Sequence, residues 1–275
     1  MVLTFPLRNA IVITELRNQL TSHSRVPLRS APRSRSQQRF AQLTPARAEI
    51  WQLTPSPGVK PANHMAIRRF QATVEGTAPL LLSNNLCSDP LSEPAKIKKH
   101  FTGKRTKSDK DHSNLRVIDW VYSGYWKNDG RVLIDDSDNS IGFEGFADLY
   151  LPSQNFQRCL RNGATAFKLG REVERALIVE NEAELDYEGP RTAEEMINHG
   201  RFIKTSPVVR QKVTNWVTRL TLPSWIAKFF LTVDDDRISI DALERIVKAA
   251  GQFEGLGTWR PRHGRFVAEL EEVDL

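Results

Sequence analysis

Cysteine is scarce in this chain of 275 residues, which contains only Cys87 and Cys159, far apart in the sequence. Neither belongs to a Cys-x-x-Cys pair or to a His/Cys spacing suited to zinc. This scarcity argues against a disulfide framework and against a structural metal, and we expect neither a metal nor a cofactor. A reducing, cytoplasmic setting agrees best with such cysteine usage.

Several other signatures are also missing from the sequence. No apolar run approaches the roughly eighteen residues that a membrane span needs, so we expect no membrane partner. There is no phosphate-binding Walker loop, no dinucleotide fingerprint and no Ser/His/Asp constellation in a recognisable local context. The acidic runs at 135–138 and 234–236 lack the glycine and the glutamate of a calcium loop, so each fits a turn instead.

The charge of the chain is unevenly distributed. The formal net charge is +6, but residues 1–64 contain nine Lys or Arg and only two acids, Glu15 and Glu49. Residues 65–275 contain thirty basic and thirty-one acidic groups, so this part is close to neutral. Any affinity of residues 65–275 for nucleic acid must therefore come from local clusters and not from net charge.

Residues 1–64 contain seven prolines and Ser/Arg repeats, which prevent sustained periodicity. We interpret them as a disordered basic arm that precedes a single domain over 65–275. Two other interpretations stay open. The segment is rich in Arg and Ser and poor in acids, as in an organelle presequence. It also fits upstream sequence translated from a wrongly chosen start, since Met65 lies just before the first good strand.

The elements expected over 65–275 predict an α+β fold. Strands are expected at 66–75, 176–179, 225–233 and 266–270, with one helix capped by Ser153 and a second capped by Ser239. Their order, β-α-β-β-α-β, is that of a ferredoxin-like or RRM-like split βαβ core, on whose open sheet face single-stranded RNA commonly lies. Large insertions are expected at about 83–150 and 181–222. They comprise a polar loop at 83–113, a helix at 115–122, a hairpin at 131–150, a helix capped by Thr192 and an exposed ribbon at 208–222.

The most informative stretch is residues 255–265, which we call the glycine–arginine loop. It contains three glycines, three arginines, a histidine and a tryptophan. Glycine allows close approach of backbone, arginine supplies forked donors for phosphate, and a tryptophan face can stack on a base. The composition predicts a loop that holds a nucleic-acid backbone. The alternative is an ordinary helix-to-strand connection with solvated arginines.

Three stretches resemble the RAMP superfamily of CRISPR-associated RNA-binding proteins, and the likeness covers roughly 66–275. Residues 76–82 (Gly-Thr-Ala-Pro-Leu-Leu-Leu) are similar to the turn after the family's first strand, and also to prophage proteins. Residues 150–161 (Tyr-Leu-Pro-Ser-Gln-Asn-Phe-Gln-Arg-Cys-Leu-Arg) resemble the motif that opens the family's first helix, with Ser-Gln-Asn in place of Gly-Ser-Ser. Residues 255–266 resemble its glycine-rich loop.

The resemblance implies a single-stranded RNA-binding protein, with RNA favoured over DNA. It implies a backbone subunit that oligomerises along a guide RNA, whose partners are copies of itself or other subunits of a ribonucleoprotein. The ribbon would then act as a thumb, although we expect Trp216 to pack in the core. The residues expected to bind nucleic acid are Gly255, Gly257, Trp259, Arg260, Arg262, His263, Gly264, Arg265, Lys104, Arg105, Lys107, Arg210, Lys212 and Arg161.

Two other functions remain open, although the interpretation that we prefer is a binding protein and not an enzyme. Some members of the family cut RNA without metal, and His263 or Asp89 would be the catalytic candidate in an endoribonuclease of this fold. A phage-type structural or assembly protein that reuses the fold for protein contacts is the second alternative.

Overall fold

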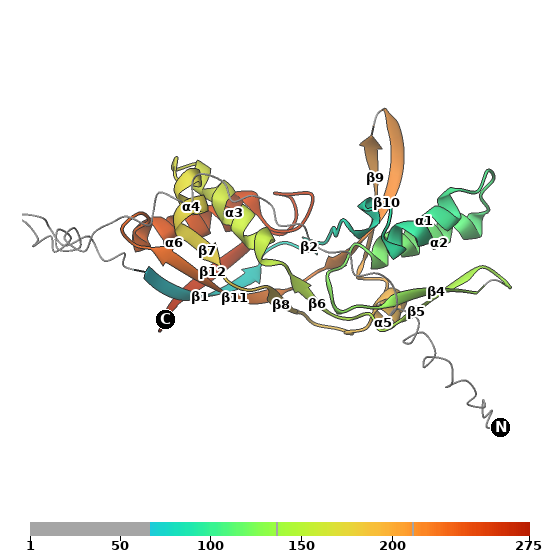
Figure 1. The fold of residues 1–275 in the computed structure, drawn as a ribbon, viewed down its shortest axis with the longest axis horizontal. Helices are drawn as coiled ribbons and strands as arrows, with labels where there is room; N and C mark the ends of the chain where they lie inside the picture. The colour runs from blue at the N-terminus through green and yellow to red at the C-terminus, as the bar shows by residue number, and fades with distance from the viewer. Residues whose placement is uncertain (1–66, 136, 211) are drawn as a thin grey trace, which may run out of the picture. The chain divides into compact units, whose positions relative to one another are not determined.

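The computed structural model describes residues 67–275 apart from 136 and 211 (Figure 1). The predictions made for residues 1–64 lie outside the described residues. Within the described part the fold is α+β, as predicted, and its strands pair antiparallel. No helix in this part of the chain is long and apolar enough to cross a membrane.

Four strands of the central sheet, β1, β7, β11 and β12, were predicted from the sequence, whereas β3 and β8 were not, and β6 was predicted as part of the hairpin at 131–150. The order of the sheet begins β12-β1-β11, and β7 pairs with β11 on the side away from β1. The sheet continues from β11 through β8 and β6 to β3, which gives seven strands among the described residues. The bounds are β1 (Ile67–Gly76), β3 (Trp126–Asn128), β6 (Ala147–Leu151), β7 (Leu177–Val179), β8 (Ala183–Asp186), β11 (Ile226–Asp234) and β12 (Phe266–Val273).

Helices cover one face of the strands β12, β1 and β11 (Figure 1), because alternate residues of these strands are apolar and face the helices. These helices are α3 (Ser153–Thr165), α4 (Gly170–Ala176) and α6 (Ile240–Ala249). The ring of Phe156, on α3, lies 4.2 Å from that of Phe229, centroid to centroid. Ser239 caps α6 as predicted, whereas Ser153 is the first residue of α3, follows the cap Pro152 and makes no capping hydrogen bond.

The prediction of a loop over 83–113 is wrong, because two helices and a short 3-10 turn occupy most of it. The helix that was predicted at 115–122 begins earlier, after a capping box formed by Ser108 and Asp111. Phe101 and Ile118 are fully buried, so both helices pack on the core. The predicted hairpin follows. The elements are η3 (Leu86–Ser88), α1 (Glu93–Thr102), α2 (Asp109–Val121), β4 (Arg131–Asp135) and β5 (Ser140–Glu144).

The predicted ribbon is a two-stranded hairpin that projects from its neighbours (Figure 1). It consists of β9 (Ile203–Arg210) and β10 (Val213–Leu222), and β2 (Leu80–Leu81) pairs with the base of β10. The short helix α5 (Ala193–His199) precedes it, capped by Thr192 as predicted. Trp216 is 58% exposed, so the prediction that it packs in the core is wrong.

Candidate nucleic-acid interface

The glycine–arginine loop leaves α6 through a π-helical turn, η4 (Ala250–Glu254), and enters β12. Four backbone hydrogen bonds attach it to the segment that follows β1, and three of them are 2.9 Å or shorter. Gly264 N donates to Pro79 O at 2.9 Å, and Thr258 N donates to Leu81 O at 2.9 Å. Thr77 N donates to Arg265 O at 2.8 Å. The loop is therefore held at both ends by ordered backbone, and its side chains project from a fixed frame.

The glycines of the loop serve this attachment. Gly257 has φ +71°, and a Cβ there would lie 2.4 Å from Leu81 O. Gly264 has φ +71° as well, and its Cβ would lie 1.9 Å from Leu256 O. Gly255 also has a positive φ and faces the carbonyl of His263. The close approach that glycine permits here is to the chain's own backbone, so these three positions shape the loop.

The three stretches singled out in the sequence meet at this loop. The segment 76–82 supplies the backbone acceptors just described. The stretch 150–161 supplies Cys159, whose thiol donates to Gly255 O at 3.2 Å and lies 3.6 Å from Ala250 O. Burial raises the pKa of Cys159 to about 12, so the thiol stays protonated and remains a donor. Residues far apart in the chain thus fix the start of the loop.

The three arginines of the loop lack acidic partners. Arg262 and Arg265 are exposed and Arg260 is half-buried. No ion pair joins any of the three to an acidic side chain among residues 67–135, 137–210 and 212–275, where thirteen such contacts occur elsewhere. Their charge is therefore not neutralised by the described part of the chain, and it is available to an anion.

The base of the ribbon adds two further cations beside the loop. The guanidinium carbon of Arg219, on β10, lies 5.3 Å from the centroid of the Trp259 ring. Lys204, on β9, is the strand partner of Arg219. Trp259 is half-buried, and its ring lies 6.1 Å from that of His263 at an interplanar angle of 46°. We call the set Lys204, Arg219, Trp259, Arg260, Arg262, His263 and Arg265 the cationic cluster.

The environment of His263 favours the neutral imidazole. Burial lowers the pKa of His263, a hydrogen bond with the backbone of Pro79 opposes this shift, and the positive charges of Lys204 and Arg262 lower the pKa further. Its Nδ1 is buried and has no hydrogen-bond partner in the described part of the chain.

A surface pocket of about 440 Å³ lies along the loop. Trp259, Arg260 and Thr258 line it together with Phe253 and Glu254 of η4. Phe253 is 69% exposed, so the pocket offers two aromatic side chains and an arginine. Such a combination suits a nucleotide, because aromatic rings stack on bases while a guanidinium binds phosphate.

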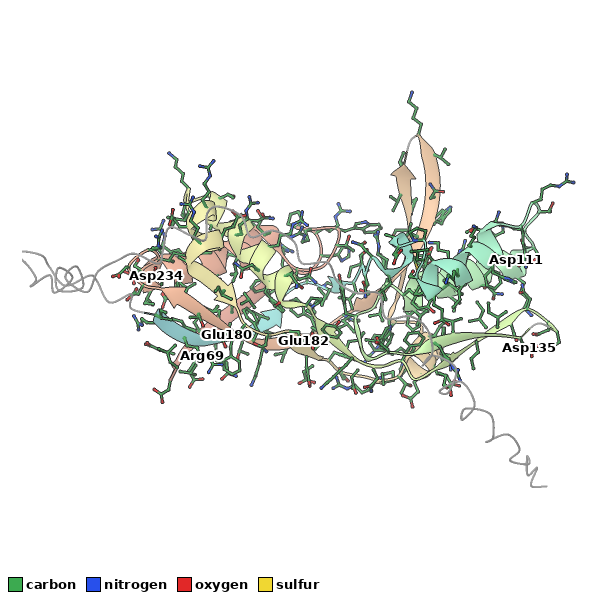
Figure 2. All side chains as sticks on the ribbon, in the orientation of Figure 1. Arg69, Asp111, Asp135, Glu180, Glu182 and Asp234 are labelled. Carbon is green, nitrogen blue, oxygen red and sulfur yellow. The ribbon has the colours of Figure 1, made fainter. Side chains whose placement is uncertain are left out.

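Other predicted site residues lie outside the cationic cluster. The connection between α1 and α2 carries Lys104, Arg105 and Lys107, at the outer end of the helix pair (Figure 1). Lys104 pairs with Asp111, which Figure 2 labels, and Lys107 donates to the carbonyl of Lys104. Only Arg105 of these three is exposed and makes no contact of this kind with a described residue.

Arg161 and the ribbon tip are also separate from the cluster. Arg161 lies in α3 and pairs with Glu174 at 2.9 Å. The tip carries Arg210 and Lys212. Arg210 pairs with Val213, which lies six residues along β10 from Arg219, or about 20 Å at the rise of an extended chain.

Asp89, the acidic candidate for catalysis, gains no support. Asp89 accepts a hydrogen bond from Leu91 N at 2.9 Å, so its carboxylate holds a turn. Nowhere in the described ranges does a group of three or more His, Cys, Asp or Glu side chains form a candidate metal site.

The open face of the central sheet is acidic. The residues that point away from the helices on β1, β12 and β8 include exposed carboxylates, and Lys228 is the exposed cation of β11. Figure 2 labels Arg69 and Glu180, which form an ion pair on this side. Phosphate would be repelled here, so the expectation that RNA lies on the open face is not favoured. The exposed strand carboxylates are Glu75, Glu184, Asp186, Glu269 and Glu271.

Sequence reasoning did not find Lys204. Its position in the sequence gives no signal, because its place beside the loop depends on the pairing of β9 with β10.

No protein-family model matches this chain, and no curated protein matches it in sequence.

Proposed function

We propose that this protein binds single-stranded nucleic acid, RNA in preference to DNA, through the cationic cluster. The observation that carries the proposal is the grouping of Arg260, Arg262 and Arg265, which form no ion pair with a described acidic side chain, in one loop with the half-buried Trp259. Phosphate contacts dominate nucleic-acid affinity, and an aromatic face stacks on any base, so the cluster suits a flexible single strand.

The preference for RNA rests on the fold that we infer. The strand order β12-β1-β11-β7, with α3 and α6 on one face, supports a ferredoxin-like core with insertions after the first strand and between the middle strands. The meeting of 76–82, 150–161 and 255–266 supports a relationship to the RAMP superfamily. Neutral His263 could hydrogen-bond a 2′-hydroxyl, which DNA lacks.

We propose that the RNA runs from the pocket beside the loop towards the base of the ribbon. The exposed Lys204 would meet the phosphate that follows the base stacked on Trp259, while the buried Arg219 supports the Trp259 ring. The ribbon also exposes Trp216, Val209 and Val213. These apolar side chains would lie beyond the bound RNA and would contact another subunit, such as a second copy. In this arrangement RNA stays away from the acidic open face.

The test is fluorescence anisotropy of labelled single-stranded RNA with the full chain at several salt concentrations. Arg260→Ala with Arg262→Ala should weaken binding and flatten its salt dependence. The matched control is Arg161→Ala with Arg237→Ala, which removes the same charge from arginines that pair with Glu174 and Glu172.

Equal losses in the two double variants would show that only net charge matters and would contradict the role of the loop. Oligomers that form without nucleic acid, together with no salt-dependent binding, would favour the structural or assembly protein instead.

A metal-independent endoribonuclease is the second candidate, and one observation favours it. His263 is neutral and its neighbour Lys204 is cationic, so the pair offers a general base for the 2′-hydroxyl and a positive charge for the developing phosphorane. Cleavage of RNA in EDTA that disappears in His263→Ala while binding persists would establish this activity. Intact RNA after prolonged incubation would exclude it.

A further inference from the structure

A second surface, whose lining is largely apolar, lies where α6 meets the edge of the central sheet. A groove of about 370 Å³ is lined on one side by Phe266, Ala268 and Leu270 of β12. Val247 of α6 lines the other side, together with Glu244 and Lys248. Ala268 and Leu270 are only partly buried, so the apolar lining remains accessible from the edge.

The edge beside this groove is a free strand. β12 is eight residues long and pairs with β1 on one side, and no strand in the described part of the chain pairs with its other side. Every second residue of such an edge directs its N–H and C=O outward. Natural proteins usually shorten, bulge or cover long edges, because an open one recruits another strand.

The geometry of strand addition defines the pattern of side chains that would fit. A strand paired with β12 would place alternate side chains on the helix side, over the groove. The remaining side chains would lie on the open face beside the exposed carboxylates of Glu269 and Glu271. The groove takes apolar groups, whereas the carboxylates take cations.

The same carboxylates argue against two other occupants. Pairing of β12 with β12 of a second copy would place Glu269 and Glu271 near their own counterparts, and like charges across strands are destabilising. Nucleic acid would be repelled by them. A polypeptide partner with positive charge is the occupant that remains.

We propose that the free edge of β12 is a docking site for an extended polypeptide segment in which apolar residues alternate with lysine or arginine. The segment adds a strand to the sheet, with its apolar side chains in the groove against Val247 and Leu270 and its cations on Glu269 and Glu271. None of Val247, Leu270, Glu269 and Glu271 belongs to the cationic cluster, and the proposal does not depend on nucleic-acid binding.

The probe is a fluorescein-labelled peptide, Lys-Val-Lys-Ile-Lys-Val-Lys-Ile, added to the full chain and followed by anisotropy. Two control peptides test the mode of binding. The first has the same composition with the lysines and the apolar residues in separate blocks. The second is N-methylated on alternate residues, which removes the donors of one edge. The account predicts saturable binding of the alternating peptide below about 1 mM and at least tenfold weaker binding of both controls.

Two protein variants locate the site. Glu269→Lys with Glu271→Lys should weaken binding of the alternating peptide at least tenfold, since both side chains are exposed and their reversal leaves the core intact. Asp129→Lys with Glu194→Lys makes the same change in net charge elsewhere and should leave the affinity within about twofold. Hydrogen exchange of the β12 amides should slow when the peptide is bound.

Equal affinity for the alternating and blocked peptides, equal losses in the two protein variants, or unchanged exchange in β12 would each overturn the proposal. Two further results would also overturn the proposal. One is the absence of saturable binding below about 1 mM, and the other is a dimer whose stability changes in Glu269→Lys with Glu271→Lys.

Discussion

The guanidinium of Arg219 lies over the ring of Trp259, 5.3 Å from its centroid, and so joins the base of the ribbon to the glycine–arginine loop. The two residues are forty positions apart, and each belongs to a different insertion or loop of the fold. Trp259 also lines the pocket beside the loop, and a base that enters this pocket would reach the ring.

Loss of the loop arginines should change the salt dependence of binding by a predictable amount. Each phosphate contact with a single strand contributes about 0.7 to the slope of log K against log salt. Arg260→Ala with Arg262→Ala should therefore reduce the slope by about 1.4, measured by anisotropy between low and physiological salt. A slope equal to that of the unchanged protein would remove these arginines from the interface.

Loss of the aromatic face should weaken binding without changing the slope. Trp259→Ala should cost about 1–3 kcal/mol of binding free energy, the range for one stacked base. Trp259→Phe keeps a smaller ring and should retain part of the affinity. If Trp259→Ala lowers the slope instead, the tryptophan supports the arginines and does not stack on a base.

The loop glycines should be sensitive to a single added methyl group. Gly257 and Gly200 have similar φ values, +71° and +68°, but a Cβ at Gly257 meets Leu81 O while that at Gly200 meets nothing within 4 Å. Gly200→Ala should cost about 1–2 kcal/mol for the left-handed backbone alone. Gly257→Ala should lower the free energy of unfolding by more than this, as measured in urea, because the clash adds to the strain. Equal costs would mean that the loop can move away from β2.

The pKa of His263 predicts how stability depends on pH. Its pKa in the folded state lies below the ordinary value of 6.5, so the unfolded chain binds this proton more tightly. The stability that the neutral imidazole contributes is complete above about pH 6.5 and falls as the pH is lowered from there towards the folded pKa. His263→Gln should make urea unfolding less dependent on pH in that window. An unchanged pH dependence in His263→Gln would show that the histidine titrates alike in both states.

The sequence predicted the central elements because their patterns are simple. Alternation from Trp225 to Val233 marks a strand with one buried face, and Ser239 before an apolar stripe marks a helix start. The pattern failed over 83–113, where lysines dominate α1 and only Ile97 and Phe101 carry its apolar stripe. Local composition hides such a helix, which depends on packing against α2.

The candidate site was predictable only in part, since its members come from different levels of structure. The composition of the loop identified Arg260, Arg262 and Trp259 directly. The position of Lys204 depends on strand register, and the exposure of Trp216 depends on whether any layer covers the ribbon. Neither property is encoded in a local window of sequence.

Photocrosslinking would show whether a single RNA strand lies on the cationic cluster. Single-stranded RNA containing 4-thiouridine would be irradiated with the full chain, and the attached residues mapped by mass spectrometry. The account predicts crosslinks within 255–265 and at the base of β9 and β10, and these should be lost in Arg260→Ala with Arg262→Ala. Crosslinks confined to residues 1–64, or to the open face of the central sheet, would contradict it.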